Sequence, residues 1–424
     1  MIAKRSVLAG TMMLACAAGA MAQEGAPQQA LQEILLRLDA LERRNEQLTQ
    51  RVEELTRQNE ALRAGSAEQT AAEPPKAAMA AAGDAVASRI GFNGDLRYRH
   101  EQIDDESLDR VRTRATLRAR FGATIAVTDS VDAEIAIATG GRNPRSASAT
   151  LGAASSRKDI GLDLGYVRWR ATDELAFTVG KMREPYVRPG VSTFFDNEIR
   201  PEGAAVHYNG PNGVFGSAFH FWLEERSVQG DSMLSGGQLG WSGKLGMWNL
   251  KAGAGYYDYG SVRGRAVGFG GGLVNQAGNS VIASGGDLLY AYDYDIGQLF
   301  AEGAFAVAGL PVTLFVDYAE NFAADNGLDT AWNAGVRLGR ANAPGRWEAV
   351  VFQQRMEKDA LFGQWIDSSF AGGVTDNEGR VYRLTWAPVR DVRANLTYFD
   401  TRYNVDVGSD ADYDRWRIDF NFVW

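Results

Sequence analysis

The stretch RVRTRATLRARFGATIAV, residues 110–127, decides the fold. Taken at every second residue, it separates into two sets of side chains. The first set is basic and comprises Arg110, Arg112, Arg114, Thr116, Arg118 and Arg120. The second set is apolar and comprises Val111, Thr113, Ala115, Leu117, Ala119, Phe121, Ala123, Ile125 and Val127. Because successive side chains of a β-strand point to opposite faces, the pattern predicts a strand with one cationic face and one apolar face.

This strand fits two environments. At ~3.3 Å per residue, its apolar face is long enough to cross a bilayer core at a tilt. A strand in lipid must have both edges paired, so its sheet would close into a barrel with the arginines in the lumen. The alternative is a long amphipathic strand of a soluble β-sandwich with its arginines in water. The rest of the chain has to distinguish the two.

The connections within residues 90–424 favour the barrel. Tight turns are predicted at 128–130, 172–173, 210–213, 246–249, 308–311, 342–345 and 388–391. Longer polar connections are predicted at 140–158, 184–202, 225–233, 263–286, 323–328, 358–377 and 406–412. Short turns on one side and long loops on the other are typical of an outer-membrane barrel with its turns in the periplasm. We therefore expect an all-β transmembrane barrel of roughly sixteen antiparallel strands.

The end of the chain repeats the alternating pattern. Its apolar set is Trp416, Ile418, Phe420, Phe422 and Trp424, and its polar set is Arg415, Arg417, Asp419 and Asn421. This C-terminal pattern resembles the last strand of outer-membrane barrels, although phenylalanine is their usual last residue. Tryptophans also lie near the ends of the predicted strands, as in an interfacial girdle. These are Trp222, Trp241, Trp248, Trp332, Trp347 and Trp386.

The N-terminal segment is expected to direct secretion. Residues 1–22 combine Lys4 and Arg5, an apolar run, and a small-x-small cleavage site that ends at Ala22. A lipoprotein signal with a lipidated Cys16 is the alternative. Cys16 is the one cysteine of the chain, so removal of the signal would leave neither a disulfide nor a cysteine metal site.

Residues 24–64 carry an uninterrupted heptad pattern, which predicts an α-helical coiled coil ahead of the barrel. Its two core positions hold Leu31, Leu38, Asn45, Val52 and Asn59, and Ile34, Leu41, Leu48, Leu55 and Leu62. Core asparagines fix the register and often favour two strands, so the coil leaves dimer and trimer open. Residues 65–89 are rich in Ala, Glu and Pro and are predicted to form a flexible linker.

Two motifs resemble the putative-porin family of Gram-negative bacteria. They are GKMREPY at 180–186 and FFDNEIRPEG at 194–203. Residues 94–101 and 163–170 resemble strands of the same family, and the resemblance extends over most of 90–424. The chain is more distantly similar to phosphate-selective and polyphosphate-selective porins, which can also carry a coiled coil. The resemblance implies a trimeric diffusion channel of about sixteen strands with one loop folded into the lumen. It names no solute, because the lysine-rich cluster that marks phosphate selectivity is not evident.

The connection 184–202 is the third outer loop when the connection between the first two strands is included, and it is the expected constriction loop. Three prolines restrict its backbone, which favours a fixed path. Its charged residues are Glu184, Arg188, Asp196, Glu198, Arg200 and Glu202. The expected pore-lining arginines are Arg97, Arg99, Arg112, Arg114, Arg118, Arg120, Arg337, Arg383, Arg393, Arg415 and Arg417. Acidic and basic groups that face each other across a pore sort solutes by charge. The alternative is an ordinary surface loop with solvated charges.

The first and last strands must pair to close a barrel, which would bring many of these arginines onto one wall. Such a wall needs acidic partners, such as Asp419 and Glu101, or passing anions. We therefore expect a preference for anions. The alternative is a neutralised wall, because the chain has a net charge of −9. One parity conflict stays open: Arg168 and Arg170 share parity with apolar residues that should face lipid.

Catalytic and nucleic-acid functions are not expected. The histidines His100, His207 and His220 lie in separate predicted strands, and no Ser/His/Asp grouping is visible. The chain is acidic without a basic tail, and no cofactor or metal is expected. The predicted function is passive diffusion of small hydrophilic solutes or ions across the outer membrane. The barrel would contact membrane lipid, and the periplasmic coil would hold a homotrimer. The alternative is an envelope tether, in which the coil contacts peptidoglycan and the barrel is only an anchor.

Overall fold

The computed structural model describes residue 50 and residues 89–227, 230–268 and 275–424. The predicted signal peptide 1–22, the coiled coil 24–64 and the linker 65–89 lie outside the described residues, apart from Gln50 and Arg89. The strands are β1 (Ile90–Asp105), β2 (Arg112–Ala126), β3 (Val131–Thr139), β4 (Ala149–Thr150), β5 (Ile160–Arg170), β6 (Leu175–Lys181), β7 (Glu202–Asn209), β8 (Val214–Glu224), β9 (Ser232–Leu245), β10 (Trp248–Gly260), β11 (Val281–Ser284), β12 (Asp287–Tyr290), β13 (Tyr294–Val307), β14 (Leu310–Asn321), β15 (Thr330–Gly339), β16 (Trp347–Met356), β17 (Asn377–Trp386), β18 (Val392–Tyr403) and β19 (Ala411–Val423). A short 3₁₀ helix, η2, spans Phe370–Gly373.

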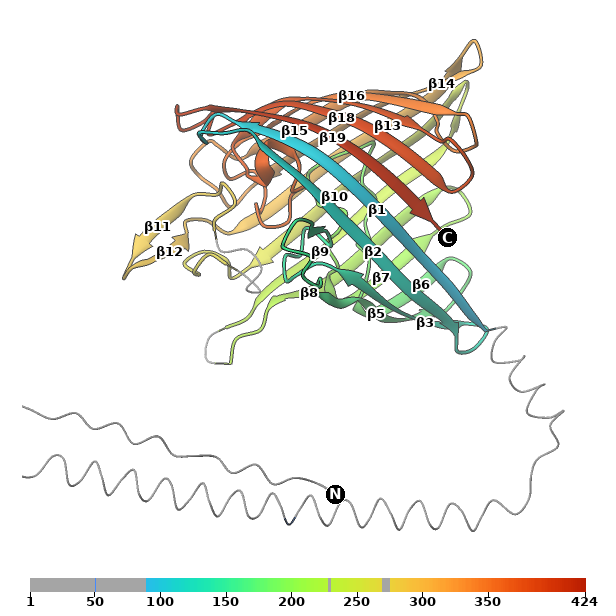
Figure 1. Ribbon diagram of the computed structural model, residues 1–424. Coiled ribbons are helices and arrows are strands. Elements are labelled where there is room, and N and C mark those ends of the chain that lie inside the picture. The colour runs from blue at the N-terminus through green and yellow to red at the C-terminus, as the bar shows by residue number, and fades with distance from the viewer. Residues whose placement is uncertain (1–49, 51–88, 228–229, 269–274) are drawn as a thin grey trace, which may run out of the picture. The chain divides into compact units, whose positions relative to one another are not determined.

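Sixteen of the described strands form one closed antiparallel barrel, which confirms the predicted barrel. Strand β1 pairs with β2 on one side and with β19 on the other, so the ring has no free edge. The short β4 pairs with β2 beyond the end of β3, and β11 and β12 form a separate hairpin. At the seam, Trp424 and Gly94 exchange two backbone hydrogen bonds of 3.1 Å. In Figure 1 the long loops gather at the left end of the barrel, and the tight turns and the C-terminus lie at the right.

The outer face of the barrel is apolar, as the alternating pattern predicts. Phe121 is 47 % exposed, Ile125 37 % and Trp416 49 %. Outward-facing rings also stack across neighbouring strands, with centroids 6.3 Å apart for Tyr382 and Tyr398 and 4.4 Å apart for Tyr398 and Trp416. An apolar band of this extent requires lipid rather than water around it. Among the described residues, no helix is long and apolar enough to cross a membrane.

A β-bulge resolves the parity conflict on β5. The register between β3 and β5 shifts by one residue, so Leu164 pairs with Ala136, Leu162 pairs with Ile137, and Asp163 has no partner. Leu162 is therefore 56 % exposed, whereas Leu164 is 1 % exposed. A bulge inserts one extra residue and so inverts the side-chain alternation beyond it. Arg168 and Arg170 consequently point to the inside of the barrel.

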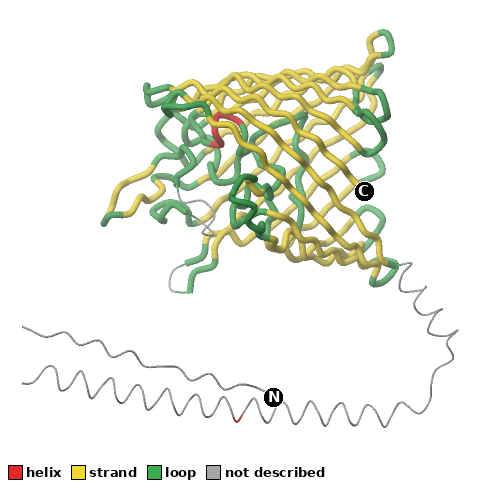
Figure 2. The backbone as a smooth tube through the Cα atoms, viewed as in Figure 1, coloured by secondary structure: helices red, strands yellow, loops and turns green. Residues whose placement is uncertain are grey.

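The interior is partly filled by loops that fold back from the left end of the barrel in Figure 2. The larger apolar cluster joins residues of loop 182–201, of the loop 357–376 and of the inner faces of strands β7–β10 and β13–β16. Its members include Tyr186, Phe194, Phe195, Phe219, Phe221, Leu234, Tyr257, Tyr259, Tyr294, Phe362 and Ile366. Because β9 and β10 carry large apolar side chains on their inner faces, the loops have a surface on which to bury their own. One side of the lumen is thus aromatic, and the opposite side carries the arginines.

Candidate constriction site

Loop 182–201 follows the inner wall of the barrel instead of extending outward. Near its start, the Val187 N–H donates to Gln238 of β9 at 2.8 Å. Further along, the Ser192 hydroxyl donates to the buried Asp317 of β14 at 2.6 Å. A surface loop would leave these groups in water, so the reading of residues 184–202 as an ordinary surface loop is excluded. The buried polar groups of the loop thus find hydrogen-bond partners on the barrel wall, as polar groups in a protein core do.

The tip of this loop lies at Gly190. Its N–H donates to Glu302 of β13, and its carbonyl accepts a hydrogen bond of 2.9 Å from Arg337 of β15. Gly190 has a φ of 55°, a conformation that costs a residue with a Cβ about 1–2 kcal/mol. An added Cβ would also lie 2.4 Å from the ring of Phe315. Only glycine therefore allows the backbone to approach the wall this closely.

Aromatic side chains anchor the loop between these polar contacts. The Tyr186 ring packs against Phe195, Phe219 and Tyr257 with centroids 5.0, 5.6 and 5.3 Å apart. Phe194 is fully buried in the same cluster. Aromatic pairs in such tilted arrangements contribute about 0.5–1.5 kcal/mol each beyond the area that they bury. The loop is therefore a fixed lining of the lumen.

Beyond its aromatic anchor, the loop brings Glu198 to the arginine wall. The carboxylate lies 3.1 Å from Arg97, 2.6 Å from Arg118 and 3.5 Å from Arg120, and it accepts the Ala147 N–H at 2.6 Å. Burial by itself would raise the pKa of Glu198, but the three guanidinium groups and the amide outweigh it. The pKa of Glu198 therefore lies well below its ordinary value, and the group stays charged.

Further carboxylates partner the same wall. Asp95 lies 2.6 Å from Arg118, and the bulged Asp163 lies 3.7 Å from Arg120 and 3.4 Å from Arg200. These contacts depend on the bulge in β5, which places Asp163 beside the loop. The acidic partners of this part of the wall therefore come from β1, β5 and the constriction loop.

The seam between β1 and β19 completes the network. Asp419 lies 2.5 Å from Arg99 and 2.9 Å from Arg417. The buried Glu101 pairs with Arg114 and Arg415, so both partners named from the sequence are used. Among the described residues, the ion pairs of this wall form three neighbouring groups. The three groups together contain eight arginines and five carboxylates and are called the arginine network below. These are Arg97, Arg99, Arg114, Arg118, Arg120, Arg200, Arg415 and Arg417, with Asp95, Glu101, Asp163, Glu198 and Asp419. The network carries an excess of three positive charges.

The remaining expected pore-lining arginines lie outside this network. Arg112 is exposed at the outer end of β2. Arg337 contacts the loop tip, and Arg383 lines a separate cavity of about 220 Å³ together with Arg417 and Arg188. Arg393 donates to the carbonyl of its neighbour Val392 at the other end of the barrel. The structure therefore distributes the expected arginines over several places in the barrel.

Glu202 corrects the predicted limits of the loop. Strand β7 begins at Glu202, which pairs in register with Lys181 at the end of β6. Both side chains share the outward parity of Val179, and the Glu202 side chain is 60 % exposed and lies 2.7 Å from the Lys181 ammonium. Side chains alternate between faces along a strand, so Glu202 lies at the rim of the barrel, off the lumen-facing side of β7. Asp196 and Arg188 stay within the loop as expected.

No pattern in the amino-acid sequence indicated the contacts of loop 357–376 with the constriction loop. The Asp196 N–H donates to the Trp365 carbonyl at 2.8 Å, and the Asp367 N–H donates to the Thr193 carbonyl at 3.0 Å. The buried Arg145, from the loop after β3, donates to backbone carbonyls of loop 357–376. Three loops are thus joined into one assembly. Among the described residues, no group of three or more His, Cys, Asp or Glu side chains could hold a metal ion.

Loop docking is expected to weaken as the pH rises. Burial raises the pKa of Glu184 to about 7, although Arg188 and the Tyr186 hydroxyl act in the opposite direction. A released carboxyl would ionise near its ordinary pKa while the docked one stays protonated, so docking loses stability as the pH rises from about 4.5 to about 7. Open-channel current is therefore expected to be quieter at about pH 5 than at about pH 8.

The variant Glu184→Gln is expected to remove part of this pH dependence. Burial, Asp367 and Glu198 raise the pKa of Asp196 to about 7 as well, so Asp196 is expected to carry the rest. Current noise measured over a pH series, for both proteins in the same bilayer, is the test. A current that becomes quieter toward alkaline pH would contradict the sign derived from these two groups.

Comparisons with known proteins also point to a porin-like barrel. Residues 104–270 match the model of a family described as Putative porin. A high-pH structure of OprB from Pseudomonas putida is 14 % identical, with 81 % of this chain and 96 % of OprB covered and a TM-score of 0.56. A loop-deletion mutant of OmpT from Vibrio cholerae is 14 % identical, with 79 % and 99 % covered and a TM-score of 0.47. A triple mutant of the Rhodopseudomonas blastica porin is 10 % identical, with 79 % and 100 % covered and a TM-score of 0.47.

The curated proteins contain no match. At its level of identity, the likeness to OprB shows the barrel fold. The family match spans the arginine strand β2 and the constriction loop, which are the parts that build the site. It supports an outer-membrane channel and confirms the resemblance seen in the sequence: over residues 104–270, this chain matches the putative-porin family.

Proposed function

We propose that this protein is an outer-membrane porin through which small hydrophilic solutes and ions diffuse passively, with a preference for anions. The observation that carries the proposal is the position of Glu198. A loop that starts on β6 and lines the aromatic side of the barrel returns to place this carboxylate against Arg97 and Arg118. The loop thereby narrows the lumen beside a charged wall. A barrel that serves only as an anchor has no need for such an arrangement.

The sign of the preference follows from the charges of the network. Eight arginines face five carboxylates, so the wall is left with uncompensated positive charge. The Nε atom of Arg97 is buried without a hydrogen-bond partner among the described residues. Interactions between charges strengthen where water is restricted, so a passing anion gains more from this wall than a cation does.

A planar-bilayer measurement tests the proposal. With the purified protein in a KCl gradient of about tenfold, the reversal potential is expected to have the sign of an anion-selective channel. A reversal potential of the opposite sign would show that carboxylates elsewhere in the lumen dominate. Absence of any conductance would remove the porin function itself.

We also propose a homotrimer with the coil 24–64 in the periplasm. The proposal is supported by the heptad pattern and by the resemblance to trimeric porins. Deletion of residues 24–64 is expected to lower the mass of the detergent-solubilised oligomer while leaving the conductance of each barrel unchanged. The same deletion addresses the tether. Detachment of the envelope with full conductance retained would favour contact between the coil and peptidoglycan.

A further inference from the structure

A cavity of about 390 Å³ lies beside the constriction, where the loop after β3, the end of the constriction loop and loop 357–376 meet. It is lined by residues 138–144, 146 and 147, by 198–202 and by Phe362, Gln364 and Trp365, together with residues at the outer ends of β5, β6 and β8. Glu198 belongs both to this lining and to the arginine network. The volume falls in the range of small-molecule sites, about 300–1,000 Å³.

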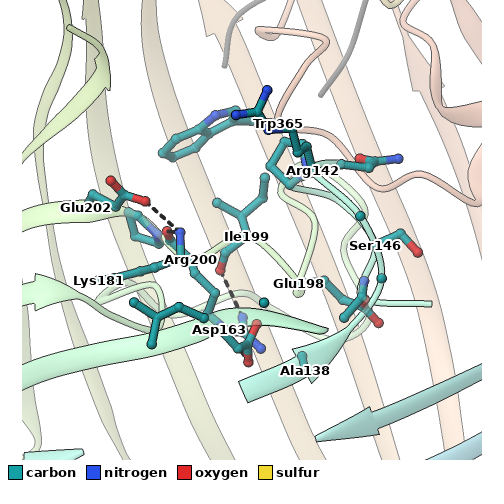
Figure 3. A pocket seen from close by; sticks show the side chains of 18 of the residues that line it. Ala138, Arg142, Ser146, Asp163, Lys181, Glu198, Ile199, Arg200, Glu202 and Trp365 are labelled. Atoms are coloured by element: carbon teal, nitrogen blue, oxygen red, sulfur yellow. Dashed lines mark hydrogen bonds and ion pairs between the residues drawn. The ribbon is translucent and has the colours of Figure 1, made fainter. Parts of the chain in front are cut away.

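Almost every charged group of the lining already has a partner. Glu198 is held by the arginine wall, Asp163 lies 3.4 Å from Arg200, and Lys181 lies 2.7 Å from Glu202. These groups form one end of the cavity in Figure 3. These groups shape the cavity and offer hydrogen-bonding atoms to it, and each of their charges is balanced by an ion-pair partner.

Arg142 is the exception. It lines the cavity, is exposed, and makes no hydrogen bond or ion pair within the described part of the chain. Figure 3 shows Arg142 beside Trp365, on the side of the cavity opposite Asp163. The Trp365 ring is half-buried and is supported edge-on by Tyr259, with centroids 5.8 Å apart. The planar guanidinium of Arg142 and the fixed indole ring of Trp365 therefore line the same cavity.

We propose that this cavity binds small monocarboxylates that carry a flat ring. The guanidinium of Arg142 would take the carboxylate through paired hydrogen bonds, for which its fork geometry is suited. The indole of Trp365 would stack against the ring. A monoanion fits better than a dianion, because the carboxylates Glu198, Asp163 and Glu202 also line the space.

The proposal rests on the porin function and names a class of solute for it. A site just outside the constriction raises the local concentration of its solute, provided that binding is weak enough to allow release. We therefore expect a Kd on the order of 1 mM, as for a transport site that fills and empties rapidly.

Calorimetry on the detergent-purified full-length protein tests the site, with benzoate as the probe. Acetate, which lacks the ring, is expected to bind about tenfold more weakly, and benzamide, which lacks the charge, is expected to bind about tenfold more weakly too. The variant Arg142→Gln is expected to weaken benzoate binding about tenfold. Trp365→Leu is expected to reduce the preference for benzoate over acetate. Equal binding of benzoate and acetate would overturn the stacking contact.

Arg157→Gln is the matched control. Arg157 is exposed in the same loop as Arg142 and is not part of the cavity lining. Its replacement removes the same charge and is expected to leave benzoate binding unchanged. Weakening by both variants to the same extent would show that general surface charge, and not the cavity, attracts the anion. Arg142→Lys keeps the charge without the fork and is expected to bind with intermediate affinity.

Bilayer conductance in KCl separates this inference from the porin function. Normal KCl conductance without saturable benzoate binding overturns the cavity proposal alone. Saturable benzoate binding that depends on Arg142, in a barrel without conductance, overturns the porin function and leaves the site in place. Normal conductance with Arg142-dependent binding supports both.

Discussion

Glu198→Gln is expected to raise the anion-to-cation permeability ratio about two- to fivefold and to make the open-channel current noisier. The substitution removes one of five carboxylates from the network and leaves Arg97, Arg118 and Arg120 with one acid fewer between them. Loss of one member of a buried ion pair costs about 3–5 kcal/mol, because its partners stay buried and unpaired. The same loss weakens the docking of loop 182–201. Reversal potential and current noise measure the two effects.

Asp391→Asn is the matched control for this experiment. It removes the same charge from an exposed side chain in the tight turn before β18, where Asp391 lies 3.3 Å from Arg390. Exposed ion pairs contribute about 0–1 kcal/mol, so neither selectivity nor noise is expected to change. A shift caused by Asp391→Asn and absent in Glu198→Gln would show that selectivity does not arise at the arginine wall.

Gly190→Val is expected to displace the tip of the constriction loop and to raise the mean conductance. Valine would have to adopt the left-handed backbone found at Gly190 and would place its Cβ 2.4 Å from the Phe315 ring. The two costs are about 1–2 kcal/mol for the backbone and about 1–3 kcal/mol for the overpacking. Displacement also breaks the contacts with Glu302 and Arg337. Single-channel recording and the rate of protease cleavage within 182–201 are the measurements.

Gly246→Val separates the backbone cost from the steric cost. Gly246 has a φ of 59° in the tight turn between β9 and β10, and an added Cβ would meet nothing within 4 Å. This variant carries the same backbone strain without the clash and without contact to the loop. Its conductance is expected to equal that of the unmodified protein. If both variants change the conductance alike, general loosening of the barrel, and not the loop tip, is responsible.

The local alternation of residues was sufficient to predict the two faces of the barrel strands. The period-two pattern at 110–127 and at the C-terminus predicted which side chains face lipid, and Phe121 and Trp416 do so. The need to satisfy every backbone group in lipid then required β1 to pair with β19, as it does. The sequence motifs and the order of the loops also identified 184–202 as the segment that enters the barrel.

The tertiary structure decided which charges meet. A single bulged residue, Asp163, inverted the alternation along β5, and its position depends on the register with β3. The choice of Glu198 as the partner of three arginines depends on the path of a loop across the lumen. The placement of Arg142 beside Trp365 depends on contacts between loops more than 200 residues apart, as the Arg145 hydrogen bonds to the same loop show. The sequence by itself determined the faces of the strands, because alternation is a property of neighbouring residues. Register, bulges and loop paths arise only from packing between distant segments, so only the folded barrel could determine the site.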